Sequence, residues 1–286
     1  MNKIILQQGD TQSFPDKWIE TKTGRIYYTN TKKYPEALTV VFMHGLSSNH
    51  TTWVHIVHTL EKLGYNTLTI ELRGHGLSDK RKKKACYQLT MFADDLQNIL
   101  QKEKIKRFII VGYSYGGAIT LEFMKRQPSG VQGLFLISTS SINPLKNKNL
   151  SWFNPLAKGL LAVLSLLFIW QKRKSYLYYR HGQAKNYWHS VWLGLNSTPL
   201  SVNFWMLAQM LKIDFTDLLP KINVPAVLVR GLNDPFISKK EAENMIKLLP
   251  NGQLETLRAS GHFIGTHCQE EILQLLWQFL KKFPLK

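Results

Sequence analysis

A serine between two glycines, placed directly after a short apolar run, is the feature that most constrains this chain. The sequence GYSYG at 112–116 follows apolar residues 108–111 and opens a helix-compatible segment. Where a strand turns sharply into a helix, a serine at the tip of the turn is held with its hydroxyl clear of the sheet. Flanking glycines leave room for so tight a turn. The pattern occurs by chance in many proteins, but in this context it predicts a nucleophile at Ser114.

A serine hydroxyl needs a base that a third group orients, and both partners are expected downstream. After Ser114 the chain has three aspartates, which are Asp214, Asp217 and Asp234. Asp234 follows the strand-like residues 226–229, and parallel strands present their carboxyl ends at one edge of a sheet. Asp214 and Asp217 precede that strand, where we expect a helix start. We predict that Asp234 is the acid, although an Asx turn would also explain it.

Histidines downstream of Ser114 are His181, His189, His262 and His267. His262 lies in a glycine-bearing loop after the strand-like residues 254–257, again at the carboxyl end of a strand. His267 is expected at the start of the last helix, in a capping or surface role. His181 and His189 belong to an inserted segment and are expected at an interface. His262 is therefore the predicted base.

An oxyanion hole is predicted from a third loop. Residues 40–43 read as a buried strand, and His44, Gly45 and Leu46 follow it. The negative charge that develops in acyl transfer needs preorganised donors, which are typically backbone amides. The amides of Leu46 and Tyr115 are the candidates. His44 is expected to shape the loop and not to act as a base.

Together these motifs resemble those of the α/β-hydrolase family. They are HG at 44–45, RGHGLSD at 73–79, GYSYG at 112–116, GLND at 231–234 and SGH at 260–262. The resemblance covers nearly the whole chain except residues 143–212. It implies that Ser114 is the nucleophile, Asp234 the acid and His262 the base. Members with an aspartate nucleophile, such as epoxide hydrolases and haloalkane dehalogenases, resemble the chain less. Residues 73–79 are expected to form a structural turn, so Ser78 is not predicted to react.

Strand-like and helix-like segments alternate along the chain, which predicts an α/β fold with a mostly parallel, doubly wound sheet covered on both faces. A chain of 286 residues that is 44% hydrophobic can bury one such core with an insertion. We expect the core at 1–142 and 213–286, with a leading hairpin around residues 18–28. Strands are expected at 40–44, 66–72, 108–113, 133–139, 226–231 and 253–259, and helices at 52–63, 90–104, 115–127, 239–249 and 267–282.

Residues 143–212 break this alternation and are expected to form an inserted helical cap. They contain five of the eight tryptophans. Between residues 146 and 212 there are nine Lys or Arg and no Asp or Glu, which is half of the formal net charge of +18. In the family that the chain resembles, a lid is inserted at this place. Lids exclude water and shape the pocket for the acyl group.

Within the cap, the twelve residues 159–170 are apolar and the basic sequence QKRK follows at 171–174. As a helix they would span about 18 Å, too little for a hydrocarbon core of about 30 Å. Either the helix is buried in the cap, or it lies in a membrane interface with tryptophans and basic residues among the headgroups. A second basic cluster at 80–84 would also attract anionic lipid.

The predicted function is that of a serine hydrolase that cleaves a carboxylic ester through an acyl-enzyme, without cofactor or metal. The apolar cap and the resemblance favour a medium or long acyl chain, as in a monoacylglycerol or lysolipid. Carbon–carbon bond hydrolysis, thioester cleavage and cofactor-free haloperoxidase activity use a similar triad and remain alternatives. A non-catalytic binding protein on the same scaffold is a further alternative.

The expected partners are a small-molecule ester and, through the cap, the surface of an anionic membrane. A pI near 9.8 also suits polyanions, but no nucleic-acid-binding motif accompanies the charge, so nucleic acid is not expected. Cys86 and Cys268 are too few for a disulfide framework or a zinc site. The apolar part of the first residues is too short for a secretory signal. These observations favour a cytoplasmic protein, with peripheral membrane contact as an option.

Overall fold

One sheet of eight strands forms the centre of the part of the chain that the structure describes. The computed structural model describes residues 15–34, 37–147, 150–171, 198–258, 261–262 and 264–284. The strands follow the order β1-β2-β4-β3-β5-β6-β7-β8, and from β4 to β8 all neighbours are parallel. Their bounds are β1 (Asp16–Thr21), β2 (Gly24–Asn30), β3 (Thr39–Met43), β4 (Asn66–Ile70), β5 (Phe108–Tyr113), β6 (Val131–Ile137), β7 (Ala226–Gly231) and β8 (Gly252–Leu257). The predicted α/β fold is therefore confirmed.

The leading hairpin is also present, because β1 and β2 pair antiparallel with Trp18 opposite Tyr27. The observed bounds of β5 and β7 equal the predicted ones, and the other core strands end within two residues of the prediction. The predicted helix at 267–282 begins at Gln269, because residues 264–267 form a separate short helix.

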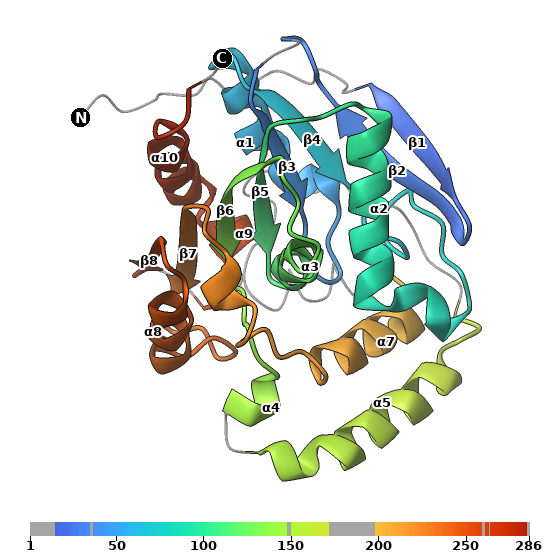
Figure 1. Cartoon of the computed structure of the whole chain (residues 1–286). Helices are drawn as coiled ribbons and strands as arrows, with labels where there is room; N and C mark the ends of the chain where they lie inside the picture. Colours follow the sequence, from blue (N-terminus) through green and yellow to red (C-terminus); the bar gives the residue numbers. More distant parts are fainter. Residues whose placement is uncertain are drawn as a thin grey trace.

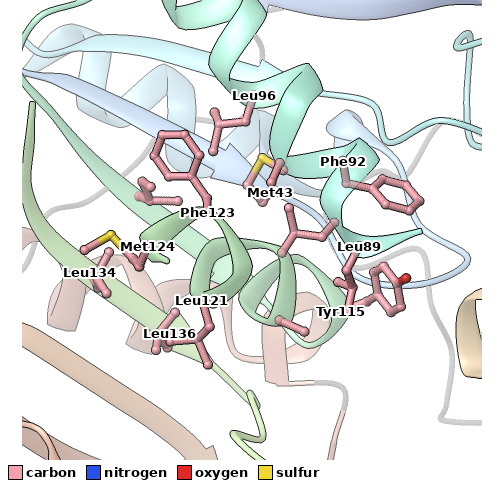
Figure 2. Packing of buried hydrophobic residues seen from close by; sticks show 14 of the residues in the cluster. Met43, Leu89, Phe92, Leu96, Tyr115, Leu121, Phe123, Met124, Leu134 and Leu136 are labelled. Carbon is pink, nitrogen blue, oxygen red and sulfur yellow. The ribbon is translucent and has the colours of Figure 1, made fainter. Parts of the chain in front are cut away.

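Helices cover both faces of the sheet (Figure 1). They are α1 (Val54–Lys62), α2 (Leu89–Lys102), α3 (Tyr115–Met124), α8 (Lys239–Leu248), α9 (Ile264–His267) and α10 (Gln269–Leu280). Successive residues of a strand point to opposite faces, so each core strand contributes to two apolar layers. Ile110 of β5 belongs to one apolar layer with residues of α2 and α3, and Figure 2 shows other members of this layer, such as Leu96 and Phe123. Ile109 and Val111 belong to the opposite layer, with residues of α1 and α10.

Between β6 and β7 the described chain leaves the sheet and forms helices. They are α4 (Pro144–Asn147), a 3₁₀ turn at Ser151–Phe153, α5 (Asn154–Leu167) and α7 (Leu200–Met210), and a further 3₁₀ turn at Leu219–Lys221 precedes β7. The helices α4, α5 and α7 lie together beyond one end of the sheet in Figure 1. The core side of α7 is buried, and its Trp205 stacks on Tyr87 with ring centroids 5.4 Å apart.

Burial of α5 inside the cap, one of the two interpretations of its sequence, is wrong. Of its residues only Ser165 is buried. A run that is apolar on every side contains no signal for which side faces the core, and here one side faces α7 while the other is exposed. In the part of the chain that the structure describes, no helix is both long and apolar enough to cross a bilayer.

The segment RGHGLSD is a structural turn, as expected. The hydroxyl of Ser78 donates a hydrogen bond to the carbonyl of Glu71 and accepts one from the amide of Tyr27. These two bonds fix the turn to the hairpin. Arg73 donates two hydrogen bonds to the carboxylate of Asp95 on α2, and both side chains are 4% exposed. A buried charge that loses its partner is strongly destabilising.

We therefore predict that Asp95→Asn lowers the free energy of unfolding by about 3–5 kcal/mol, because it leaves the Arg73 charge buried and unpaired. Asp94→Asn is the matched control, since Asp94 is half exposed in its pair with Arg126 and should contribute less than about 1 kcal/mol. Urea unfolding measures the free energy of unfolding of both variants. Equal losses would contradict a buried, stabilising pair of Arg73 and Asp95. The double change Arg73→Met with Asp95→Leu should recover most of the loss.

Candidate active site

Ser114 occupies a sharp turn between β5 and α3. Its backbone has φ 51° and ψ −110°, a conformation that non-glycine residues rarely adopt. Such a backbone persists only where its surroundings hold it. At Gly116 an added Cβ would lie 2.2 Å from the carbonyl oxygen of Met43, and at Gly112 one would lie 2.7 Å from the Cα of Gly117. The two glycines therefore let the end of β3 and the start of α3 close around the serine.

The structure brings Ser114, His262 and Asp234 together from three loops. The Oγ of Ser114 lies 2.8 Å from Nε2 of His262. The other ring nitrogen of His262, Nδ1, lies 3.0 and 3.1 Å from the two carboxylate oxygens of Asp234. These loops follow β5, β7 and β8, the strands whose carboxyl ends were expected to meet. An alcohol, an imidazole and a carboxylate in this order can activate the alcohol oxygen for attack.

Asp234 is held as a carboxylate. Burial opposes its ionisation, but the hydrogen bond and charge of His262 and the amides of Phe236 and Ile237 outweigh burial, so its pKa lies below the ordinary value of 3.8. The two amides donate to Oδ1 at 2.9 and 3.1 Å. An ionised Asp234 accepts the Nδ1–H of His262, so that Nε2 carries no hydrogen and can accept the proton of Ser114.

Two aromatic residues that the sequence analysis did not select position His262. The hydroxyl of Tyr113 donates to the carbonyl of His262 at 3.1 Å. The ring of Phe236 meets the imidazole edge to face at 4.9 Å. Tyr113 directly precedes the nucleophile, but a single sequence gives no sign that its hydroxyl reaches a loop 149 residues away.

The two predicted oxyanion donors lie where the loop after β3 meets the start of α3. The close approach of Gly116 to Met43 and His44 joins these two segments. In the described part of the chain, the amides of Leu46 and Tyr115 donate to no acceptor. Tyr115 is also the first residue of α3, where the helix dipole favours negative charge. The amide of Tyr115 directly follows Ser114 in the chain, so it and the amide of Leu46 stay the candidates to hold an oxyanion.

The loop that contains Leu46 is held both by the core and by α7. Ser47 has φ 59°, and its amide donates to Nε2 of His75 at 3.1 Å. Its hydroxyl donates to Oδ1 of Asn203 on α7 at 2.9 Å. His44 is fully buried, which lowers its pKa to about 4, and its ring bonds to the backbone of Gly45 and Leu72. His44 therefore shapes the loop as a neutral ring, as expected.

The other candidates lie away from Ser114 or outside the described residues. Asp214 and Asp217 precede a short 3₁₀ helix at Leu219–Lys221, near the expected helix start. The carboxylate of Asp214 accepts from Thr216 in an Asx turn and pairs with Lys146 at 2.7 Å. Asp217 is exposed. His267 ends α9 and does not begin α10. His181 and His189 fall outside the residues that the structure describes.

Comparison with known proteins agrees with this geometry. The family model described as the alpha/beta hydrolase fold matches residues 39–265, which include every residue of the candidate site. The chain belongs to the α/β-hydrolase family. The expectation from the sequence motifs is thus confirmed at the level of family and fold.

Three individual proteins that resemble this chain share less than a quarter of the aligned residues with it. Protein ABHD8 of Bos taurus is 24% identical over 257 residues, which are 88% of this chain and 58% of that protein. The chain thus spans little more than half the length of this relative. An esterase from Exiguobacterium antarcticum has a TM-score of 0.68 and 21% identity, covering 90% of this chain and 96% of that one. A bromoperoxidase from Bacillus anthracis has a TM-score of 0.72 and 19% identity, covering 94% and 100%. At these identities the two structures show the fold alone.

The close approach of Gly116 to the backbone of Met43 leads to a prediction. Gly116→Ala should lower the free energy of unfolding by at least about 2 kcal/mol, because its methyl group cannot avoid the backbone oxygen of Met43. Gly159→Ala is the matched control: Gly159 lies in α5 with no atom near its added Cβ, so alanine should leave stability equal or raise it by up to about 1 kcal/mol. Urea unfolding compares the two. A Gly116→Ala protein as stable as the wild type would contradict the close approach.

Proposed function

We propose that this protein is a serine hydrolase that cleaves a carboxylic ester through an acyl-enzyme on Ser114. The observation that supports this most strongly is the continuous chain of contacts from Ser114 Oγ to His262 and from His262 to the buried carboxylate of Asp234. Family membership supports hydrolysis, and the amides of Leu46 and Tyr115, which have no acceptor among the described residues, suit the oxyanion of acyl transfer.

In the proposed reaction the Oγ of Ser114 attacks the acyl carbonyl carbon while Nε2 of His262 takes the hydroxyl proton. The amides of Leu46 and Tyr115 bind the oxyanion of the tetrahedral intermediate. His262 then gives its proton to the leaving alcohol, and the acyl group stays on Ser114. Water attacks the acyl-enzyme with His262 again as the base, which releases the acid and restores the serine. Asp234 stays ionised throughout and stabilises the imidazolium.

We further propose a medium or long acyl chain, of the kind found in a monoacylglycerol or lysolipid. The support is the composition of residues 143–212, which are rich in apolar and aromatic side chains. In the described part of this segment, α7 presents Val202, Trp205 and Met206 to the apolar layer that also contains Tyr115. An apolar cap beside the nucleophile favours an apolar acyl group over a short or charged one.

Cofactor-free haloperoxidase chemistry is the second candidate, because a bromoperoxidase is among the structures of similar fold. Thioester or carbon–carbon bond cleavage would use the same residues. A cytoplasmic site of action belongs to the same proposal: two cysteines in 286 residues are too few for a disulfide framework, which suits a reducing compartment.

Kinetics of triad variants test the reaction. On p-nitrophenyl esters, Ser114→Ala and His262→Ala should lower kcat by more than about 10⁴-fold and Asp234→Asn by about 10⁴-fold, since each change removes a member of a unit that works together. Asp217→Asn and His267→Ala are matched controls that should keep kcat within about threefold, because neither side chain reaches the serine. A folded wild-type protein that hydrolyses no ester, or controls that fail like the triad variants, would overturn the proposal.

Acyl-chain preference tests the substrate class separately. With p-nitrophenyl esters of graded length, kcat/KM should rise from the acetyl ester toward medium and long chains, because each methylene buried under the cap contributes about 0.8 kcal/mol. Activity confined to short acyl chains would remove the lipase part of the proposal and leave the esterase part standing.

A further inference from the structure

The exposed side of α5 is an apolar surface. Leu156, Leu160, Val163 and Leu167 follow one another at intervals of four, three and four residues, which places them on one face of the helix. Each of them is more than half exposed, as is Leu166 beside them. Contiguous apolar side chains on a protein surface mark a contact with something else.

Tryptophans stand at both ends of this helix. Trp152 precedes α5 in the 3₁₀ turn and is 74% exposed, and Trp170 follows it and is 77% exposed. An indole ring is apolar with one polar N–H, so it is most stable where an apolar phase meets water. Two such rings flanking an apolar helix face are typical of a helix that lies in a membrane interface.

A basic loop adjoins the same surface. The Nζ of Lys82 lies 4.1 Å from the ring centroid of Trp170, which brings the loop at 81–84 to the end of α5. Lys82, Lys83 and Lys84 are all exposed. Lys80 points inward and bonds to backbone oxygens of the RGHGLSD turn, so it belongs to the fold and not to this surface. From residue 143 to 171 the sequence has no Asp or Glu that would oppose a negative partner.

We propose that this surface, formed by residues 151–170 and the loop at 81–84, docks on an anionic lipid bilayer. The apolar face of α5 enters the boundary between headgroups and acyl chains, the two tryptophans lie at headgroup level, and the lysines face lipid phosphates.

Nucleic acid would gain nothing from exposed leucines. A second copy of this chain is disfavoured by charge, because each copy has a formal net charge of +18. The proposal is independent of the chemistry at Ser114.

Binding to vesicles tests it directly. The full chain with Ser114→Ala, which cannot consume the lipid by the proposed reaction, is sedimented with phosphatidylcholine vesicles and with vesicles that also contain about 30 mol% phosphatidylserine. It should bind the anionic vesicles at least tenfold more tightly, and the difference should shrink as salt is raised from 0.05 to about 0.5 M. Equal binding to both kinds of vesicle, or binding to neither, would overturn the proposal.

Paired variants locate the contact. Lys83→Gln with Lys84→Gln should weaken binding by about 10- to 30-fold, because each basic residue near the surface contributes about three- to fivefold. Lys239→Gln with Lys240→Gln removes the same charge from the exposed start of α8 and should change binding by less than about threefold. If the two pairs weaken binding equally, net charge and not this surface is responsible.

Apolar variants complete the test. Trp152→Gln should weaken binding by at least tenfold, whereas Trp18→Gln, at an exposed tryptophan on β1, should not. Leu160→Gln with Val163→Gln should act like Trp152→Gln, and circular dichroism should show an intact fold because both positions are exposed. Sedimentation velocity without lipid is the last measurement. A dimer that these two changes abolish would assign the face to a second copy and overturn the proposal.

Discussion

The arrangement of the site depends on one close backbone contact, between the end of β3 and the start of α3. Only a residue without a side chain fits at position 116, because a Cβ there would overlap the carbonyl of Met43. This contact joins the loop after β3, which contains Leu46, to the start of α3, where Ser114 has its unusual backbone. The parallel order of β5, β7 and β8 then presents Asp234 and His262 at the same edge, so the sheet supplies the rest of the geometry.

The glycine pattern and the strand ends made much of this predictable from sequence. A short apolar run followed by a glycine-bearing loop defines both an element and the edge at which its polar residue lies, which is why Ser114, Asp234 and His262 could be selected. Tyr113 and Phe236 could not, because their roles depend on loops that meet only in the folded chain. The exposed side of α5 could not be predicted from the sequence either, since an evenly apolar helix does not indicate which side packs against α7.

Helix α7 contacts the features on which the two proposals depend. Asn203 on α7 accepts a hydrogen bond from Ser47 in the loop after β3, while α5 packs on α7 and presents leucines to the outside. A substrate with a long acyl chain would be dilute in water and concentrated in a bilayer. A lipid-binding face on the cap would hold the nucleophile close to that supply, although each proposal can fail without the other.

Covalent capture of the serine tests the central claim most directly. A fluorophosphonate reacts with a serine only when a neighbouring base removes its proton and an oxyanion hole receives the phosphoryl oxygen. Mass spectrometry of the treated chain should show one adduct, on the peptide that contains Ser114, and none after His262→Ala. An unmodified wild-type protein, or an adduct on any other residue, would contradict the account.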